Sequence, residues 1–174
     1  VGAFDLYGST GNDVLKGNSS AQMLSGGAGN DTLDGKGGVD HLDGGIGNDT
    51  YQYARDYGSC TIHDYDSTLG NQDVLNFATG ITNDQLWFSQ QGNDLVVSVI
   101  GTQDAVTVKD WYSGSANHVE KIKTDMEELF KVRKDVFKAL ENARAQGLIG
   151  KSLEAHVVLH VSDAQKEIMD RVLS

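Results

Sequence analysis

The chain has 174 residues, of which 39% are hydrophobic, and a formal net charge of −11. It has room for one large domain or two small ones, and no apolar run reaches the roughly 20 residues that span a bilayer, so we expect no transmembrane segment. The acidity disfavours nucleic acid and anionic lipid as partners and favours cations. A single cysteine, Cys60, excludes an internal disulfide framework and a zinc cluster built mainly on thiolates.

The composition changes sharply near Lys123. Residues 1–123 carry 16 acidic and 6 basic side chains and 19 of the 21 glycines, whereas residues 124–174 carry 9 acidic and 8 basic side chains. Fifteen of the 16 acids in the first part are aspartates, while the second part has more Glu than Asp. The sequence therefore predicts two different kinds of polypeptide that meet at this point.

Glycine-rich repeats with a period of nine run from Gly8 to Gln52. The eighth position of each repeat is apolar, and the sixth is Asp in every repeat except the second. A disordered glycine-rich linker would not keep an apolar residue at every ninth position, so the period indicates a repeated structural unit. The five repeats are GSTGNDVLK (8–16), GNSSAQMLS (17–25), GGAGNDTLD (26–34), GKGGVDHLD (35–43) and GGIGNDTYQ (44–52).

Each repeat combines a glycine turn with a short strand that carries one inward apolar side chain. One repeat alone buries nothing, but two consecutive repeats make one coil, and such coils stack about 4.8 Å apart. Stacking places Leu15, Leu33 and Tyr51 in one ladder. It places Leu24 and Leu42 in the facing ladder.

Asp13, Asp31 and Asp49 fall into one column in this arrangement because each is separated from the next by two repeats. Carboxylates about 5 Å apart repel by about 3 kcal/mol per pair at an effective dielectric constant of about 20. The column therefore requires cations. Hard oxygen ligands without a rigid geometry select Ca²⁺ over transition metals.

The repeats resemble the haemolysin-type calcium-binding repeats of the RTX family, whose fold is a parallel β-roll with Ca²⁺ between successive loops on the same edge. The resemblance implies that each ion takes carbonyls two and four and the Asp of one loop, with carbonyls one and three and the Asp of the loop two repeats later. Six oxygen ligands suit Ca²⁺. The implied first site is Ser9, Gly11 and Asp13 with Gly26, Ala28 and Asp31, and the second is Gly27, Gly29 and Asp31 with Gly44, Ile46 and Asp49.

The opposite edge and the end of the roll offer weaker candidates. Gln22 stands where the second repeat lacks its Asp, so a site facing Asp40 is expected to be weak or absent. Cys60 occupies a position where related sequences often place Asp. The two further sites implied by the family pattern are Lys36, Gly38 and Asp40 with Tyr53 and Arg55, and Gly45, Gly47 and Asp49 with Thr68, Gly70 and Asp73.

Apolar alternation replaces the nine-residue period between residues 53 and 123 and predicts strands at 74–77, 86–88, 95–100, 105–108 and 119–122. We expect them to form an antiparallel meander that caps the open end of the roll. The phrases DQLWF (84–88), QGNDL (91–95) and DWY (110–112) resemble the flank of the last repeat block in the adenylate cyclase toxin-haemolysin family. Four bulky side chains are core candidates or, alternatively, a carbohydrate or protein contact surface: Trp87, Phe88, Trp111 and Tyr112.

The tail, residues 124–174, has a helix–strand–helix pattern. Apolar residues recur at helical spacing over 126–145, alternate over 153–161 and return to helical spacing over 164–173. The phrases KALE (138–141) and IGKSLEA (149–155) resemble a C-terminal segment of isoleucyl-tRNA synthetase, without the catalytic motifs of that family. The tail is therefore interpreted as a fused fragment, and the alternative is a C-terminal type I secretion signal.

The expected fold is mostly β, with RTX β-roll repeats in 1–52, a flanking cap in 53–123 and a small α/β appendage in 124–174. The expected function is that of a module that binds several Ca²⁺ ions and folds outside the cell. The resemblance implies a secreted bacterial toxin or exoprotein exported by type I secretion machinery. The alternative is a Ca²⁺-stabilised module that binds polysaccharide or a host receptor, and the absence of a recognisable catalytic constellation argues against an enzyme.

Overall fold

The computed structural model describes residues 4–78 and 80–124. The chain divides into two units, Val1–Thr124 and Asp125–Ser174, and the helix–strand–helix pattern predicted for the tail lies outside the described residues. The regular elements of the described part are strands and three 3₁₀ helices. The strands are β1 (Leu6–Tyr7), β2 (Val14–Lys16), β3 (Met23–Ala28), β4 (Thr32–Asp34), β5 (Gly38–Ile46), β6 (Thr50–Tyr53), β7 (Gly58–Ile62), β8 (Val74–Phe77), β9 (Leu86–Gln91), β10 (Asp94–Val99), β11 (Ala105–Val108) and β12 (Lys121–Lys123), and the 3₁₀ helices are η1 (Asn83–Gln85), η2 (Trp111–Ser113) and η3 (Ser115–Asn117).

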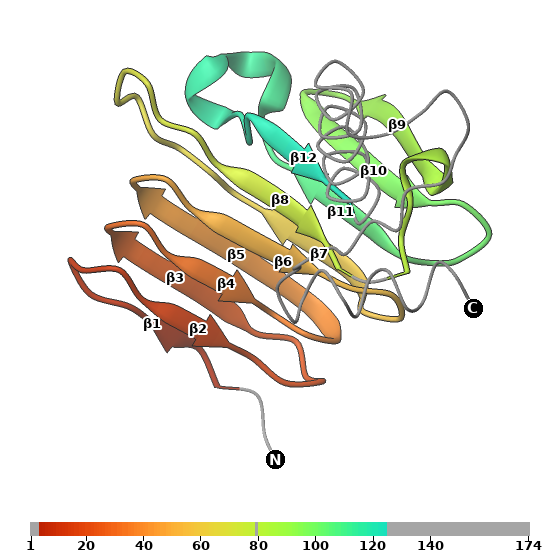
Figure 1. The fold of residues 1–174 in the computed structure, drawn as a ribbon, viewed down its shortest axis with the longest axis horizontal. Helices are drawn as coiled ribbons and strands as arrows, with labels where there is room; N and C mark the ends of the chain where they lie inside the picture. Colours follow the sequence, from red (N-terminus) through yellow and green to blue (C-terminus); the bar gives the residue numbers. More distant parts are fainter. Residues whose placement is uncertain (1–3, 79, 125–174) are drawn as a thin grey trace, which may run out of the picture. The chain divides into compact units, whose positions relative to one another are not determined.

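The strands form two sheets that face each other (Figure 1). The strand order is β1-β3-β5-β7-β11-β10-β9 in the seven-stranded sheet and β12-β8-β6-β4-β2 in the five-stranded sheet. From β1 to β8 the chain alternates between the sheets, and every neighbouring pair among these strands is parallel. This alternation is a coil repeated along one axis, so the predicted parallel β-roll is confirmed.

The apolar ladders have the predicted register. Leu15 pairs with Leu33 and Leu33 with Tyr51 in the five-stranded sheet, and Leu24 pairs with Leu42 in the seven-stranded sheet. Glycine turns of constant length keep these partners two repeats apart, so every eighth-position side chain points into the same interior.

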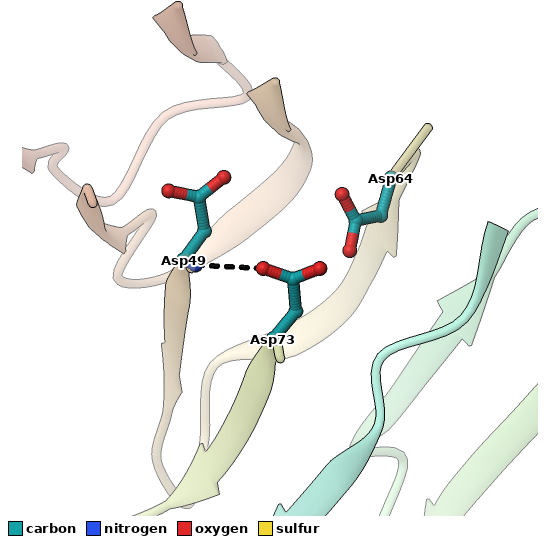
Figure 2. Close-up of side chains that lie close together, drawn as sticks. All are labelled: Asp49, Asp64 and Asp73. Carbon is teal, nitrogen blue, oxygen red and sulfur yellow. Dashed lines mark hydrogen bonds between the residues drawn. The ribbon is translucent and has the colours of Figure 1, made fainter. Parts of the chain in front are cut away.

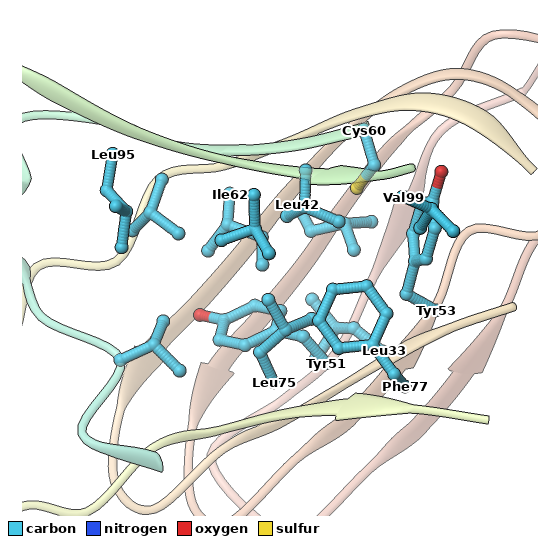
Figure 3. Packing of buried hydrophobic residues seen from close by; sticks show 14 of the residues in the cluster. Leu33, Leu42, Tyr51, Tyr53, Cys60, Ile62, Leu75, Phe77, Leu95 and Val99 are labelled. Atoms are coloured by element: carbon cyan, nitrogen blue, oxygen red, sulfur yellow. The ribbon is translucent and has the colours of Figure 1, made fainter. Parts of the chain in front are cut away.

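Side chains from both ladders fill the space between the sheets (Figure 3). Leu24, Leu33 and Tyr51 are fully buried, and Leu42 is 2% exposed. Burial of each such side chain contributes on the order of 2 kcal/mol, so the ladders supply the apolar stabilisation that a single repeat lacks.

The roll continues beyond the repeats with longer spacings. The two-repeat spacing would pair Leu42 with Cys60, but its partner is Ile62. Tyr51 likewise pairs with Leu75, further along the chain than the repeat would place its partner. Ile122 of β12 then pairs with Leu75 in a parallel register. The five-stranded sheet is therefore extended by β8 and β12, which were expected in the antiparallel meander.

The antiparallel meander consists of β9, β10 and β11. It continues the seven-stranded sheet because β11 pairs in parallel with β7, through partners such as Val106 and Cys60. Val97, Val99 and Val106 of the meander are buried against the same core as the ladders. The meander thus closes the end of one sheet of the roll, as predicted.

Three of the four aromatic core candidates of this region are exposed, whereas Trp111 is partly buried and packs against the core. Trp87 is 64% exposed, and Phe88 and Tyr112 are 49% exposed. Trp111 is half-buried and stacks on His118 with ring centroids 4.4 Å apart. Trp87 and Phe88 lie on β9, the edge strand of the seven-stranded sheet, where the smaller valines of β10 and β11 already fill the core.

Candidate calcium-binding site

A column of aspartates follows one edge of the roll, directly before the strands of the five-stranded sheet. Asp13, Asp31, Asp49 and Asp73 precede β2, β4, β6 and β8, respectively. Asp31 is 1% exposed, and Asp49 and Asp73 are fully buried. The turn that ends each glycine loop places its sixth residue here, so Asp13, Asp31 and Asp49 follow from the repeat, whereas Asp73 is added by the strand after it.

Three aspartates of the column are oriented by the backbone of the preceding coil, whereas Oδ2 of Asp13 accepts the N–H of Ser9 in its own loop at 2.7 Å. The N–H of Asp13 donates to Oδ1 of Asp31 at 2.8 Å, and the N–H of Asp31 donates to Oδ1 of Asp49 at 2.7 Å. The N–H of Asp49 donates in the same way to Oδ1 of Asp73 at 2.6 Å. One oxygen of each of these carboxylates is thus fixed in place.

The other oxygen is the one available to a cation. Oδ2 of Asp31 and Oδ2 of Asp49 are buried and accept no hydrogen bond. A buried, unpartnered carboxylate oxygen is costly, and coordination of a cation removes this cost. Because the oxygens available as metal ligands are hard carboxylate oxygens, the residues present are suited to Ca²⁺.

Successive glycine loops stack so closely that their carbonyl oxygens lie against the next loop. A methyl group at Gly27 would overlap the carbonyl oxygen of Ser9, and one at Gly29 would lie 2.8 Å from that of Gly11. Similarly, one at Gly26 would lie 2.6 Å from the carbonyl oxygen of Gly44. These contacts bring together the backbone of the two sites implied for this edge.

Five of the carbonyl positions implied for these sites lie in β3 or β5, namely Gly26, Gly27, Ala28, Gly44 and Ile46. Ala28 pairs with Ile46 between β3 and β5. The N–H of Ala28 donates to the carbonyl of Ser9 at 3.1 Å, and the carbonyl of Ile46 accepts from the N–H of Gly29 at 2.8 Å. The ligand role of these carbonyls remains a prediction.

Burial favours the neutral form of two aspartates in the absence of a cation, one in the column and one on the opposite edge. Burial, with the charges of Asp73 and Asp31, raises the pKa of Asp49 to about 6. Burial likewise raises the pKa of Asp40, on the opposite edge, to about 6. A bound cation acts in the other direction and stabilises the ionised carboxylates.

Gln22 replaces the missing aspartate of the opposite edge and uses its amide fully. Its Oε1 accepts the N–H of Asn18 at 2.6 Å, and its Nε2 donates to the carbonyl of Phe4 at 2.6 Å. Its own N–H donates to Oδ1 of Asp40 at 3.0 Å. Since the amide is neutral and has partners on both sides, these contacts agree with the prediction of a weak or absent site.

Cys60 stands opposite Asp40 in the register between β5 and β7. The thiol is 7% exposed and free, and burial raises its pKa to about 12. A neutral thiol is a poor ligand for Ca²⁺, so Cys60 acts as a packed core residue at this position.

The structure does not bring together one of the implied calcium sites, which joins Lys36, Gly38 and Asp40 to Tyr53 and Arg55. This implied site assumed the constant two-repeat spacing, whereas Gly38 pairs with Gly58 in a longer coil. The carbonyl of Tyr53 accepts the N–H of Ala78 at 2.7 Å. Arg55 donates to the carbonyl of Gly80 at 2.8 Å, and Lys36 pairs with Asp34 at 2.9 Å.

The set that joins Gly45, Gly47 and Asp49 to Thr68, Gly70 and Asp73 is brought together in part. Asp49 and Asp73 meet, as described above. The carbonyl of Thr68 instead accepts the N–H of Asn71 at 3.2 Å, and no described atom lies within 4 Å of a methyl group placed on Gly70.

Two acidic residues that the sequence did not single out occupy this end of the column. Oδ2 of Asp66 accepts the N–H of Gly47 at 3.0 Å, and Oε2 of Glu120 accepts the N–H of Asp73 at 2.7 Å. Glu120 is the only glutamate of residues 1–123, which was the one available sign that it differs from the other acids.

Two known families match parts of the chain. Residues 5–21 and 17–51 match the RTX calcium-binding nonapeptide repeat, and residues 94–125 match the haemolysin-type calcium binding protein related domain. The chain is 31% identical over 72 residues to the iron-regulated protein FrpA of Neisseria meningitidis serogroup C, which is 41% of this chain and 6% of FrpA.

Other matches are shorter or cover only a small share of the matched protein. Isoleucine–tRNA ligases of Lactobacillus johnsonii and Limosilactobacillus reuteri are 43% and 45% identical over 53 and 51 residues, which is 30% and 29% of this chain. The chain spans 6% of the length of each of these curated relatives. Among solved structures, the extracellular lipase LipA of Serratia marcescens is 28% identical with a TM-score of 0.31, covering 59% of this chain and 18% of LipA.

Proposed function

Residues 5–51 are RTX calcium-binding nonapeptide repeats, which bind calcium ions, and from this premise we propose that the chain is a module that folds when Ca²⁺ binds. The observation that carries the proposal is the pair of buried, unpartnered oxygens on Asp31 and Asp49. Without a cation the roll must bury these acidic groups uncompensated, and the free energy of metal binding offsets that cost.

The acidic composition supports the same proposal for the unfolded state. Residues 1–123 carry ten more acidic than basic side chains and most of the glycines. Such a chain gains little from burial and repels itself, so it stays unfolded when Ca²⁺ is scarce. Ligand that binds only the folded state then shifts the equilibrium by mass action.

The setting proposed for this response is the space outside a bacterial cell. RTX repeats are typical of secreted bacterial proteins, and among the described residues no helix is long and apolar enough to cross a membrane. We propose that the parent protein is a toxin or exoprotein exported by type I secretion machinery. Low cytosolic Ca²⁺ would keep the module unfolded before export, and millimolar external Ca²⁺ would fold it afterwards.

Circular dichroism in the far ultraviolet tests the proposed folding response. We expect little β signal in EDTA, a cooperative gain of β signal in several millimolar Ca²⁺, and no comparable gain in Mg²⁺, which dehydrates reluctantly and requires a stricter geometry. The same β content in EDTA and in Ca²⁺ would disprove the proposal.

A second candidate function is recognition of polysaccharide or a host receptor. The observation that favours it is the exposure of Trp87, Phe88 and Tyr112 on elements outside the repeats, since exposed aromatic rings provide large contact areas for a ligand. On a glycan array in Ca²⁺ the chain is expected to bind a ligand and Trp87→Ala to lose it, with the Ca²⁺-dependent β signal unchanged. Absence of any bound glycan would count against this candidate.

A further inference from the structure

Three buried aspartates meet where the last repeat joins the strands that follow it (Figure 2). Asp49 precedes β6, Asp73 precedes β8 and Asp64 follows β7. One carboxylate oxygen of each lies within 4.8 Å of those of the other two, and Asp64 is 1% exposed. We call these three residues the junction triad. It links the sheets, because β6 and β8 belong to the five-stranded sheet and β7 to the seven-stranded sheet.

The junction triad gathers unpartnered oxygen atoms. Five buried side-chain oxygens of the described residues lack a hydrogen-bond partner, and four of them belong to Asp49, Asp64 and the neighbouring Asn71. Both oxygens of Asp64 are among them. The oxygens of Asp73 accept the N–H of Asp49 and the Nδ2 of Asn71, each at 2.6 Å. Figure 2 shows the carboxylate of Asp64 directed at Asp73 across the gap between the two sheets.

No basic side chain of the described residues compensates these charges. The ion pairs of this part of the chain are Lys36–Asp34 and Lys109–Asp94, and both lie elsewhere. Burial, together with the charges of Asp73 and Asp49, raises the pKa of Asp64 to about 9. A buried group of three carboxyls with free oxygens and no organic cation has the composition of a divalent-cation site.

We infer that the junction triad binds a Ca²⁺ ion that fastens the strands after the repeats to the roll. The inference rests on the proposed calcium response but extends it, because Asp64 and Asp73 lie outside residues 5–51, which carry the repeats. Carboxylate oxygens of Asp49, Asp64 and Asp73 lie close enough together to hold one ion, and hard, flexible oxygen ligands select Ca²⁺ over Mg²⁺. A pocket of about 290 Å³ is lined in part by Asn71 and Glu120, both of which hydrogen-bond to Asp73.

Asp64→Asn tests the inference, because it removes one charge and leaves the shape of the side chain unchanged. At saturating Ca²⁺ we expect native mass spectrometry to count one bound ion fewer than in the unaltered chain. Both tryptophans, Trp87 and Trp111, lie in the segments after the repeats, so their fluorescence reports the folding of that part. In Asp64→Asn, the Ca²⁺ concentration at the midpoint of the fluorescence change is expected to rise by about tenfold. The midpoint of the far-ultraviolet change should shift less. The matched control is Asp84→Asn, which alters an exposed aspartate and should behave like the unaltered chain.

A second variant keeps the test decisive if Asp64→Asn folds poorly. Asp73→Asn retains an oxygen that can accept the N–H of Asp49 and should also lose one ion. An unchanged ion count in both variants would overturn the inference, and so would loss of the β signal at saturating Ca²⁺ in both, since the repeat site at Asp13 and Asp31 lies outside the triad. If the unaltered chain is already folded in EDTA, the proposed function fails, while the ion count still decides whether the triad binds Ca²⁺.

Discussion

Replacement of Asp31 by Asn is expected to raise the Ca²⁺ concentration at the folding midpoint by about tenfold. Asp31 belongs to both sites implied for the first edge of the roll, and its Oδ2 is buried without a partner. Loss of one carboxylate ligand weakens each site by about tenfold, or about 1.4 kcal/mol. Because folding takes up both ions, a tenfold loss at both sites shifts the midpoint concentration by about tenfold. Oδ1 is kept in the variant and still accepts the N–H of Asp13, which separates metal binding from loop geometry. A Ca²⁺ titration followed by far-ultraviolet circular dichroism measures the midpoint.

Comparison with Asp13→Asn tests whether the larger midpoint shift of Asp31→Asn arises because Asp31 contributes to two calcium sites. Asp13 belongs to one implied site, so a tenfold loss at that site should raise the midpoint concentration by only about threefold. Asp13 also lies at the start of the column and is less buried than Asp31. Equal shifts in the two variants would contradict the assignment of Asp31 to two ions, and no shift in either would contradict calcium binding at this edge.

Replacement of Gly45 by Ala is expected to destabilise the Ca²⁺-loaded roll by about 2–5 kcal/mol. Gly45 has a φ of +95°, a conformation that costs an L-residue about 1–2 kcal/mol. A methyl group there would also overlap the carbonyl oxygen of Gly27 in the preceding coil, and relief of such overlap costs a further 1–3 kcal/mol or so. Urea unfolding in saturating Ca²⁺ measures the free energy of unfolding.

Gly101→Ala is the matched control for this effect. Gly101 has a φ of +81° and lies in the turn between β10 and β11, where no described atom lies within 4 Å of an added methyl group. Gly101→Ala should lower the free energy of unfolding only by the cost of the positive φ, about 1–2 kcal/mol. If both variants lost the same free energy, close stacking of the glycine loops would not contribute to the stability of the roll.

The nine-residue period was sufficient to predict the repeat part of the fold. A fixed period fixes the register, so the ladders through Leu33 and Leu42 and the column through Asp31 followed from spacing alone. The period also showed that Gln22 interrupts the opposite edge. The structure added that Oε1 of Gln22 accepts the N–H of Asn18, just as Oδ2 of Asp13 accepts the N–H of Ser9.

Beyond the repeats, spacing stops being informative because strand pairing, rather than sequence distance, places the residues. The coils lengthen after β5 and again after β6, so sets extrapolated to Arg55 and Gly70 were out of register. Asp64 reaches the end of the column from the opposite sheet, which no single-strand pattern reveals. The sequence also left open whether Trp87 is a core or a surface residue, because hydrophobic alternation predicts a strand but does not show which of its side chains are covered.

The lengthening spacing also affects the order in which the chain gains structure. Coils of the repeat part join neighbours two repeats apart, whereas β12 joins β8 through partners more than twice as far apart in sequence, such as Leu75 and Ile122. Closing the longer segment costs about 0.9 kcal/mol more chain entropy than closing one repeat coil. The two ends of the roll therefore differ in contact order: the repeat end forms through local encounters, and the far end through a long-range search that succeeds only once β8 is in place.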